Sequence, residues 1–192
     1  MKKNKIKKLS EGENFISDYL RSEKIKFDTQ VRIYDLKNDT KKYRDADFYL
    51  PNLKVYIEFN GMWNVSKEDR ERYRLKKKVY FTNNIPCIYL YPENLGIIDY
   101  CFSKRLVDVL KKDNLKKELF KYRFNRLKED RGDLFFWVIA TTLILIFSDY
   151  TFSENKSIFL FFISVLIYQI SRLYNGYIKF FRNTNYYSFI KE

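Results

Sequence analysis

The sequence predicts an α/β domain, in which helices flank a mixed central sheet, followed by an apolar helical hairpin. Two observations support this fold class. In residues 9–112, segments with helical spacing of apolar residues alternate with short runs of strand-forming residues bounded by turns. In residues 133–174, charged residues become few and two long apolar runs occur. A chain of 192 residues has room for one such domain and a small appendage, but not for two large domains.

Periodicity and turn signals define the individual elements. Ser10 has the position of an N-cap, and Ser66, followed three residues later by Asp69, marks a second capped helix start. Pro51 opens a turn between two strands, where it costs no hydrogen bond of the sheet. The elements expected are helices over 11–23, 66–80, 98–110 and 115–127, and strands over 25–34, 43–50, 55–59 and 86–91.

The chain is strongly basic, and most of its basic residues precede the apolar part. The formal net charge is +13, and residues 1–132 hold 32 Lys and Arg against 20 Asp and Glu. Such a surface attracts polyanions, so nucleic acid and anionic lipid headgroups are the partner classes to consider. Histidine is absent, which excludes Ser-His triads, His-ligated zinc and histidine general bases. Carboxylates and lysines must carry any chemistry, because Cys87 and Cys101 lack metal-ligand spacing and are interpreted as structural.

Two uncharged runs of fifteen residues, 134–148 and 157–171, predict a transmembrane hairpin. At ~1.5 Å per residue each run covers about 23 Å of a hydrocarbon core of roughly 30 Å, so flanking residues such as Tyr150 and Arg172 must extend the spans. Basic residues lie on both outer flanks, and the positive-inside rule then predicts two spans in the cell inner membrane with both termini cytoplasmic. The alternative is a pair of buried helices in a soluble protein.

The expected organisation has five segments. They are a basic arm over 1–8, the α/β domain over 9–112, a basic juxtamembrane helix over 113–132, the hairpin over 133–174, and a basic, aromatic tail over 175–192 along the anionic inner leaflet. No apolar stretch follows the basic start, so no cleavable signal peptide is expected.

Asp47 and Glu58 form the most informative pair of residues. They lie eleven residues apart on neighbouring predicted strands joined by a short turn, so both carboxylates can reach one sheet edge and share a divalent cation. Oxygen ligands suit Mg²⁺ or Mn²⁺, which would polarise a phosphodiester and acidify an attacking water. Glu58 follows the apolar run 55–57, where burial of a carboxylate is costly without a metal or a cationic partner. The alternative is that Glu58 pairs with a lysine of the helix over 66–80.

Four motifs, in this order, resemble the PD-(D/E)xK nucleases, in particular the small bacterial very-short-patch-repair branch. They are Glu13 within Gly12-Glu13-Asn14-Phe15-Ile16, Asp47-Phe48-Tyr49-Leu50-Pro51, Ile57-Glu58-Phe59-Asn60-Gly61, and the helix and strand that contain 75–80 and 85–95. The resemblance covers residues 10–95, about half of the chain. It implies a restriction-endonuclease-like fold, metal-dependent hydrolysis of phosphodiester bonds, and a role for Glu13 in holding the metal or its water.

The motif's lysine should follow the glutamate by two residues, where this chain has Asn60. An asparagine cannot stabilise developing negative charge as an ammonium group would. Related proteins often supply the lysine from the following helix, which makes Lys76 the candidate and Lys77 the second choice. The alternative is a site that binds nucleic acid without cutting it.

The expected mechanism is in-line, metal-dependent cleavage. Asp47 and Glu58 would hold Mg²⁺ or Mn²⁺, with the backbone carbonyl of Phe59 as a third ligand. Glu13 would orient the attacking water, and Lys76 would assist the developing negative charge. Basic side chains of the same helix would bind backbone phosphates without reading sequence, namely Arg70, Arg72, Arg74, Lys77 and Lys78.

The sequence therefore predicts a membrane-anchored, Mg²⁺-dependent endonuclease acting on nucleic acid, with DNA favoured. Defence against phage in a bacterium fits this architecture. Expected partners are nucleic acid, anionic lipid and a second copy of the chain, because many nucleases pair to cut both strands. No small-molecule cofactor is expected. Two alternatives stay open: a membrane-tethered nucleic-acid-binding protein with a catalytically degenerate nuclease fold, and a scaffold whose basic helix over 115–127 docks on lipid.

Overall fold

The computed structural model describes residues 8–147 and 156–182 and divides the chain into two compact units, Met1–Leu119 and Phe120–Glu192. Residues 1–7 of the predicted arm, residues 149–155 of the predicted loop and the tail beyond residue 182 lie outside the described residues. The first unit contains α1 (Glu11–Ser22), β1 (Asp28–Tyr34), β2 (Tyr43–Leu50), β3 (Val55–Phe59), α2 (Lys67–Thr82), β4 (Cys87–Leu90), the 3₁₀-helix η1 (Pro92–Ile97) and α3 (Ile98–Lys112).

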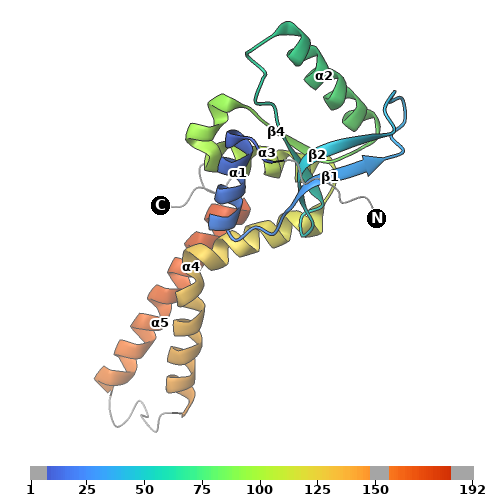
Figure 1. The fold of residues 1–192 in the computed structure, drawn as a ribbon. Helices are drawn as coiled ribbons and strands as arrows, with labels where there is room; N and C mark the ends of the chain where they lie inside the picture. The colour runs from blue at the N-terminus through green and yellow to red at the C-terminus, as the bar shows by residue number, and fades with distance from the viewer. Residues whose placement is uncertain (1–7, 148–155, 183–192) are drawn as a thin grey trace, which may run out of the picture. The chain divides into compact units, whose positions relative to one another are not determined.

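The first unit is built on a four-stranded mixed sheet in the order β1-β2-β3-β4. β1, β2 and β3 pair antiparallel, while β3 and β4 are parallel neighbours because the chain returns through α2 (Figure 1). The predicted α/β class with a mixed sheet and helices is confirmed at this level.

Helices cover both faces of this sheet. On one face, α2 packs through Val79 and Tyr80, which form a buried cluster with Cys87 of β4. The opposite face is apolar, since Phe48 and Ile57, a facing pair in the β2–β3 register, are both buried. α1 and α3 also contribute fully buried side chains to the core, and α3 contacts β3 and β4.

Local signals in the sequence explain where the elements begin and end. Ser10 and Ser66 act as the predicted N-caps, each accepting a hydrogen bond from a backbone N–H three residues on. β2 and β3 have the predicted bounds, because the turn at Pro51 separates them. β1 begins at Asp28, three residues later than predicted, and η1, which starts at Pro92, was not predicted.

The second unit consists of most of α4 (Lys116–Phe147), α5 (Lys156–Tyr177) and the short π-helix η2 (Ile178–Arg182). The predicted basic helix and the first apolar run are joined in α4, with a local departure from helical geometry at Arg131 (φ −133°, ψ 17°). α4 and α5 approach closely near their basic ends: a Cβ atom on Gly176 would lie 2.7 Å from Cδ1 of Leu127, and Lys179 pairs with Asp130 at 3.6 Å.

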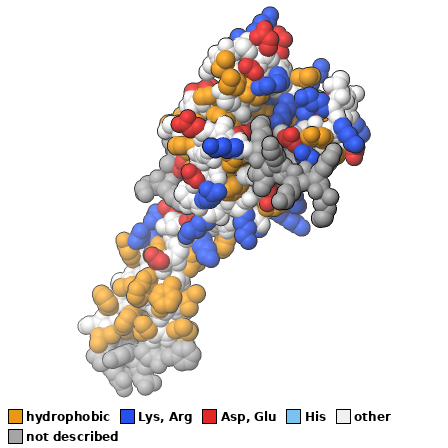
Figure 2. Space-filling view, in the orientation of Figure 1, with side chains coloured by type: hydrophobic (Ala, Val, Ile, Leu, Met, Phe, Trp, Pro, Cys, Tyr) orange, Lys and Arg blue, Asp and Glu red, His pale blue; other side chains and the backbone are white. Residues whose placement is uncertain are grey.

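Apolar side chains gather on the surface of this second unit (Figure 2). Within the described residues one helix, Lys156–Arg182, is long and apolar enough to cross a membrane by length and composition. Its apolar side chains are largely exposed, among them Phe161 (63%) and Ile167 (62%). The other predicted run, 134–148, contributes to α4 as far as Phe147 and does not reach the same criterion within the described residues.

Candidate active site

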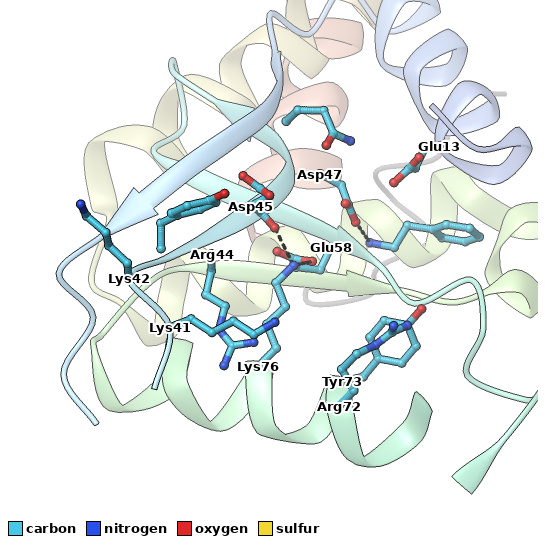
Figure 3. Close-up of a pocket in the computed structure, with 13 residues that line it drawn as sticks. Glu13, Lys41, Lys42, Arg44, Asp45, Asp47, Glu58, Arg72, Tyr73 and Lys76 are labelled. Atoms are coloured by element: carbon cyan, nitrogen blue, oxygen red, sulfur yellow. Dashed lines mark hydrogen bonds and ion pairs between the residues drawn. The ribbon is translucent and has the colours of Figure 1, made fainter. Parts of the chain in front are cut away.

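Asp47 and Glu58 lie on adjacent antiparallel strands and share one face of the sheet. The β2–β3 register pairs Phe48 with Ile57, so its continuation by one residue places Asp47 opposite Glu58. Oδ2 of Asp47 accepts a 2.7 Å hydrogen bond from the backbone N–H of Phe59, which fixes this carboxylate against β3 (Figure 3). The structure therefore brings together the two acids that the sequence singled out.

Glu58 is almost completely buried, with 2% of the residue exposed, and α2 supplies a donor to each of its carboxylate oxygens. Nζ of Lys76 lies 2.5 Å from Oε2, and the hydroxyl of Tyr80 donates to Oε1 at 2.9 Å. Lys76 and Tyr80 are four residues apart and so lie on the same side of α2. The ammonium of Lys76 also donates to the backbone carbonyl of Asp45 at 2.7 Å.

The alternative interpretation of Glu58 is confirmed, while the metal-binding interpretation stays a prediction. Glu58 does pair with a lysine of the following helix, and that lysine is Lys76, the residue expected to replace the motif lysine at Asn60. The pair is not a surface ion pair, since the side chain of Lys76 is 18% exposed and that of Glu58 3%. Asn60 is buried where its backbone N–H donates to the carbonyl of Leu90.

Burial dominates the electrostatics of both acids. It raises the pKa of Asp47 to about 8, with the negative charge of Glu58 as the second cause and Lys76 acting in the opposite direction. Burial also raises the pKa of Glu58, against the lowering effect of Lys76 and Tyr80. A single ammonium group therefore faces the buried carboxylate of Glu58 and the half-buried carboxylate of Asp47, and such a site favours an additional cation or proton.

Glu13 lies at the edge of this arrangement. It is a buried residue of α1 and lines the same pocket as Asp47 and Glu58. Its Oε2 accepts a 2.6 Å hydrogen bond from the N–H of Ser10, so the carboxylate closes the capping box at the start of α1. Its charge contributes to raising the pKa of Asp47. The helix start therefore orients Glu13 as well as being stabilised by it.

The acids line a pocket of about 630 Å³ with basic residues on two sides (Figure 3). Arg72, Tyr73 and Lys76 come from α2 on one side. On the other side, Lys41 and Lys42 precede β2, and Arg44 is part of β2. Four residues of the site were not predicted from the sequence, namely Lys41, Lys42, Arg44 and Tyr80. The sequence did contain one signal for the second side of the pocket. It is the pair Lys41-Lys42, which lies directly before the strand that carries Asp47.

Of the five basic residues expected to bind nucleic acid, the structure places Arg72 in the pocket wall. The guanidinium of Arg74 lies over the ring of Trp63 (5.7 Å), and Lys77 lies over Tyr89 (5.1 Å) and lines a separate cavity of about 110 Å³. Arg70 and Lys78 do not line the pocket within the described residues. Helical spacing explains the difference, because positions 72, 76 and 80 form one stripe and positions 70, 74 and 78 lie on the other side.

The candidate ligands at this site would suit one kind of divalent cation. Within residues 8–147 and 156–182, no three acidic or cysteine side chains form a group that could hold a metal ion alone. Asp47 and Glu58 with the main-chain carbonyl of Phe59 would leave several positions to water. This is how Mg²⁺ usually binds, through one or two carboxylates with several waters retained. The residues present therefore fit Mg²⁺ or Mn²⁺ better than a cation that needs many protein ligands.

Comparison of the chain with family models, with curated proteins and with solved structures gives no match.

Proposed function

We propose that this chain is a membrane-anchored, metal-dependent nuclease with a restriction-endonuclease-like catalytic unit, and that it hydrolyses phosphodiester bonds of nucleic acid, DNA in the first place. One observation carries the proposal. The buried carboxylate of Glu58 and the half-buried carboxylate of Asp47 lie opposite each other on adjacent strands, with the ammonium of Lys76 on Glu58, in a pocket with basic walls. Acids alone would repel a polyanion, and basic residues alone would only bind it.

Asp47, Glu58 and the carbonyl of Phe59 are the groups that would hold Mg²⁺ or Mn²⁺. When bound, the cation supplies Lewis acidity and neutralises negative charge at the scissile phosphate. The raised pKa values of the two acids support this assignment, because a divalent cation offsets the cost of keeping both carboxylates ionised in a buried place.

The chain's own residues would then do three things. Glu13, held by its capping box, accepts a hydrogen bond from the attacking water and orients it. Lys76 donates to the phosphate oxygen on which negative charge develops, and Glu58 holds this ammonium in place. Arg72 and the other basic side chains of the pocket hold the neighbouring phosphates.

The membrane part of the proposal rests on α5. We infer that α5 and the apolar half of α4 form a two-helix hairpin across the cell inner membrane, with both termini cytoplasmic. The close approach of Gly176 to Leu127 supports an antiparallel pair, and the basic residues near that end suit the inner side of the membrane. Fusions of a fluorescent protein to either terminus should both be accessible from the cytoplasm.

Cleavage by the full chain in detergent tests the catalytic proposal. Supercoiled plasmid and labelled oligonucleotides would be incubated with Mg²⁺, Mn²⁺ or EDTA. We expect cutting that requires metal and falls by at least about a hundredfold in Asp47→Asn, Glu58→Gln and Lys76→Ala. Asp18→Asn is the matched control, since Asp18 is an exposed carboxylate that pairs with Arg21 and does not line the pocket.

Two outcomes would contradict the proposal. Cutting that persists in EDTA or in Asp47→Asn would come from another site or another protein. A chain that is folded and binds DNA, yet does not cut with either metal, would instead be the catalytically degenerate binding protein that the sequence left open.

A further inference from the structure

Residues 35–42, the hairpin loop that connects β1 and β2, supply part of the pocket wall. Its last two residues, Lys41 and Lys42, are exposed and line the pocket that contains Asp47 and Glu58. In the part of the chain that the structure describes, neither ammonium group has an ion-pair or hydrogen-bond partner. The other cations of the pocket differ in this respect, because Lys76 is bound to Glu58 and Arg72 to Asp69.

The hairpin loop is fixed at its base by an ion pair between Arg44 and Asp39. The guanidinium of Arg44 makes two hydrogen bonds to Asp39, of 2.6 and 2.7 Å, and the two side chains are 6% and 1% exposed. Asp39 also accepts a 3.1 Å hydrogen bond from the backbone N–H of Lys41. The carboxylate of Asp39 therefore neutralises Arg44 and also fixes the part of the loop next to Lys41 and Lys42.

A second anchor joins the loop to the end of α2. The side chain of Asn83, the C-cap of this helix, accepts from the N–H of Lys37 at 2.7 Å and donates to its carbonyl at 3.0 Å. The two basic walls of the pocket are thus connected through Asn83. A loop held at both ends loses little further conformational entropy when its side chains bind a ligand.

Such anchoring exceeds what a strand connection needs. Two residues suffice to join antiparallel strands, and burial of an ion pair carries a desolvation cost. The loop therefore has a role beyond connection, and its chemistry indicates which one. Glu13, Asp47 and Glu58 would repel a nucleic-acid backbone from the pocket floor, and the cations of α2 are already paired, so the unpaired cations of the hairpin loop are the ones available to hold it there.

We propose that Lys41 and Lys42 bind backbone phosphates of nucleic acid that flank the scissile phosphate, as the wall opposite Arg72. This inference rests on the proposed function and adds the path of the substrate, which crosses the pocket between the hairpin loop and α2. The contacts are to phosphates, so they contribute affinity and positioning but no sequence preference.

Binding of labelled DNA to the full chain tests this inference. A fluorescein-labelled duplex would be titrated in EDTA over a series of salt concentrations, with Lys41→Ala/Lys42→Ala beside the wild type. Each lost phosphate contact lowers the slope of log K against log salt by about 0.9, so the double variant should lose nearly 2 from the slope and at least about tenfold in affinity at low salt. The variant Lys41→Arg/Lys42→Arg keeps the two charges and should therefore keep the slope and the affinity of the wild type.

The matched control is Lys111→Ala/Lys116→Ala. It removes the same two charges from exposed lysines that do not line the pocket, and it should leave the slope unchanged. If Lys41→Ala/Lys42→Ala binds like the wild type, or if the control loses as much, the inference is overturned while metal-dependent cutting by the wild type still upholds the nuclease. If the slope falls as expected but no variant cuts, the binding wall stands and the nuclease fails. If the wild type binds no DNA, both fail.

Discussion

Tyr80 binds the carboxylate oxygen of Glu58 that Lys76 does not contact. Its side chain is fully buried, and its hydroxyl donates to Oε1 of Glu58 at 2.9 Å. A hydrogen bond to a carboxylate favours the ionised form, so Tyr80 opposes the burial that raises the pKa of Glu58. The residue is a positioning residue in the proposed site, although its ring also packs in the core.

Tyr80→Phe should separate these two roles, because it keeps the ring and removes the hydroxyl. We expect a loss of about 1–3 kcal/mol in the free energy of unfolding, since a buried carboxylate oxygen loses its donor. The pKa of Glu58 should rise further, so the acid limb of the pH profile of cutting should move to higher pH. Tyr56→Phe removes a hydroxyl from a residue packed on the same cluster and should leave the profile in place. A profile that moves equally in both variants would argue against a specific role for Tyr80.

Asp47 gives a prediction for the pH dependence of metal binding. Its pKa is raised to about 8 by burial and by the charge of Glu58. Below this pH the carboxyl group is protonated, so a cation must displace a proton and binds more weakly. The affinity for Mn²⁺ should therefore increase as the pH rises toward about 8 and level off above it. Calorimetric titration would measure this, and Asp47→Asn should bind Mn²⁺ more weakly and with a smaller pH dependence. An affinity that is constant over this range in the wild type would contradict the assignment.

At the level of elements, the site depends on how α1 packs against the end of β3. A Cβ atom on Gly12 would overlap the ring of Phe59, and one on Gly61 would lie 2.8 Å from the same ring. Phe59 is also the residue whose backbone N–H fixes Asp47. The two glycines therefore permit the close approach that brings Glu13 to the wall of the pocket.

Gly12→Ala should disturb this contact. We expect a loss of about 1–3 kcal/mol in stability from overpacking, together with reduced cutting, because the ring of Phe59 must move and the backbone N–H of this residue holds Asp47. Gly96→Ala in η1 is the control, since a Cβ atom there has no neighbour within 4 Å. Thermal unfolding and cutting rates of the two variants would be compared, and equal behaviour would show that the Gly12 contact is not needed.

The elements that local signals control were predictable from the sequence. The turn at Pro51 and the alternation on either side of it define β2 and β3, and this hairpin is what places Asp47 opposite Glu58. Lys41 and Lys42 were not predicted as site residues, because they reach the pocket only through the anchoring of the hairpin loop by Asp39 and Asn83. Tyr80 was not predicted as a site residue either, since no local pattern reveals that a buried tyrosine will meet a carboxylate from another element.

The basic residues of α2 show the same limit of prediction from the sequence. A run of basic residues identifies a basic helix, but the face that meets the sheet depends on tertiary packing. The structure directs Arg72 and Lys76 to the pocket and stacks Arg74 and Lys77 on aromatic rings elsewhere. In α4, the sequence placed a boundary between a basic helix and an apolar run, yet only Arg131, next to Gly132, departs from helical geometry.

At the scale of the whole molecule, the chain combines a basic α/β unit with an exposed apolar helix. Apolar surface as extensive as that of α5 is unfavourable in water and marks a membrane or protein contact. A membrane anchor would confine cutting to nucleic acid that reaches the inner surface of the cell membrane, which suits a defence role.

Ile167→Lys tests the anchor, because Ile167 is exposed and lies near the middle of α5. A lysine at the centre of a membrane-spanning helix costs about 2.5–3.5 kcal/mol, so less protein should remain in membranes after carbonate extraction. Tyr177→Lys, at the last residue of α5, should be retained because a lysine there can reach the headgroups. If both variants stay in the membrane fraction like the wild type, α5 does not span the membrane.

We propose above all that Asp47 and Glu58 support metal-dependent hydrolysis of nucleic acid. The most direct measurement is the initial rate at which the full chain cuts a labelled DNA duplex in Mg²⁺, beside Asp47→Asn that is shown by circular dichroism to be folded. We expect cutting by the wild type that stops on addition of EDTA and falls by at least about a hundredfold in the variant. Equal rates in the two proteins, or no cutting by a folded wild type that binds the duplex, would contradict it.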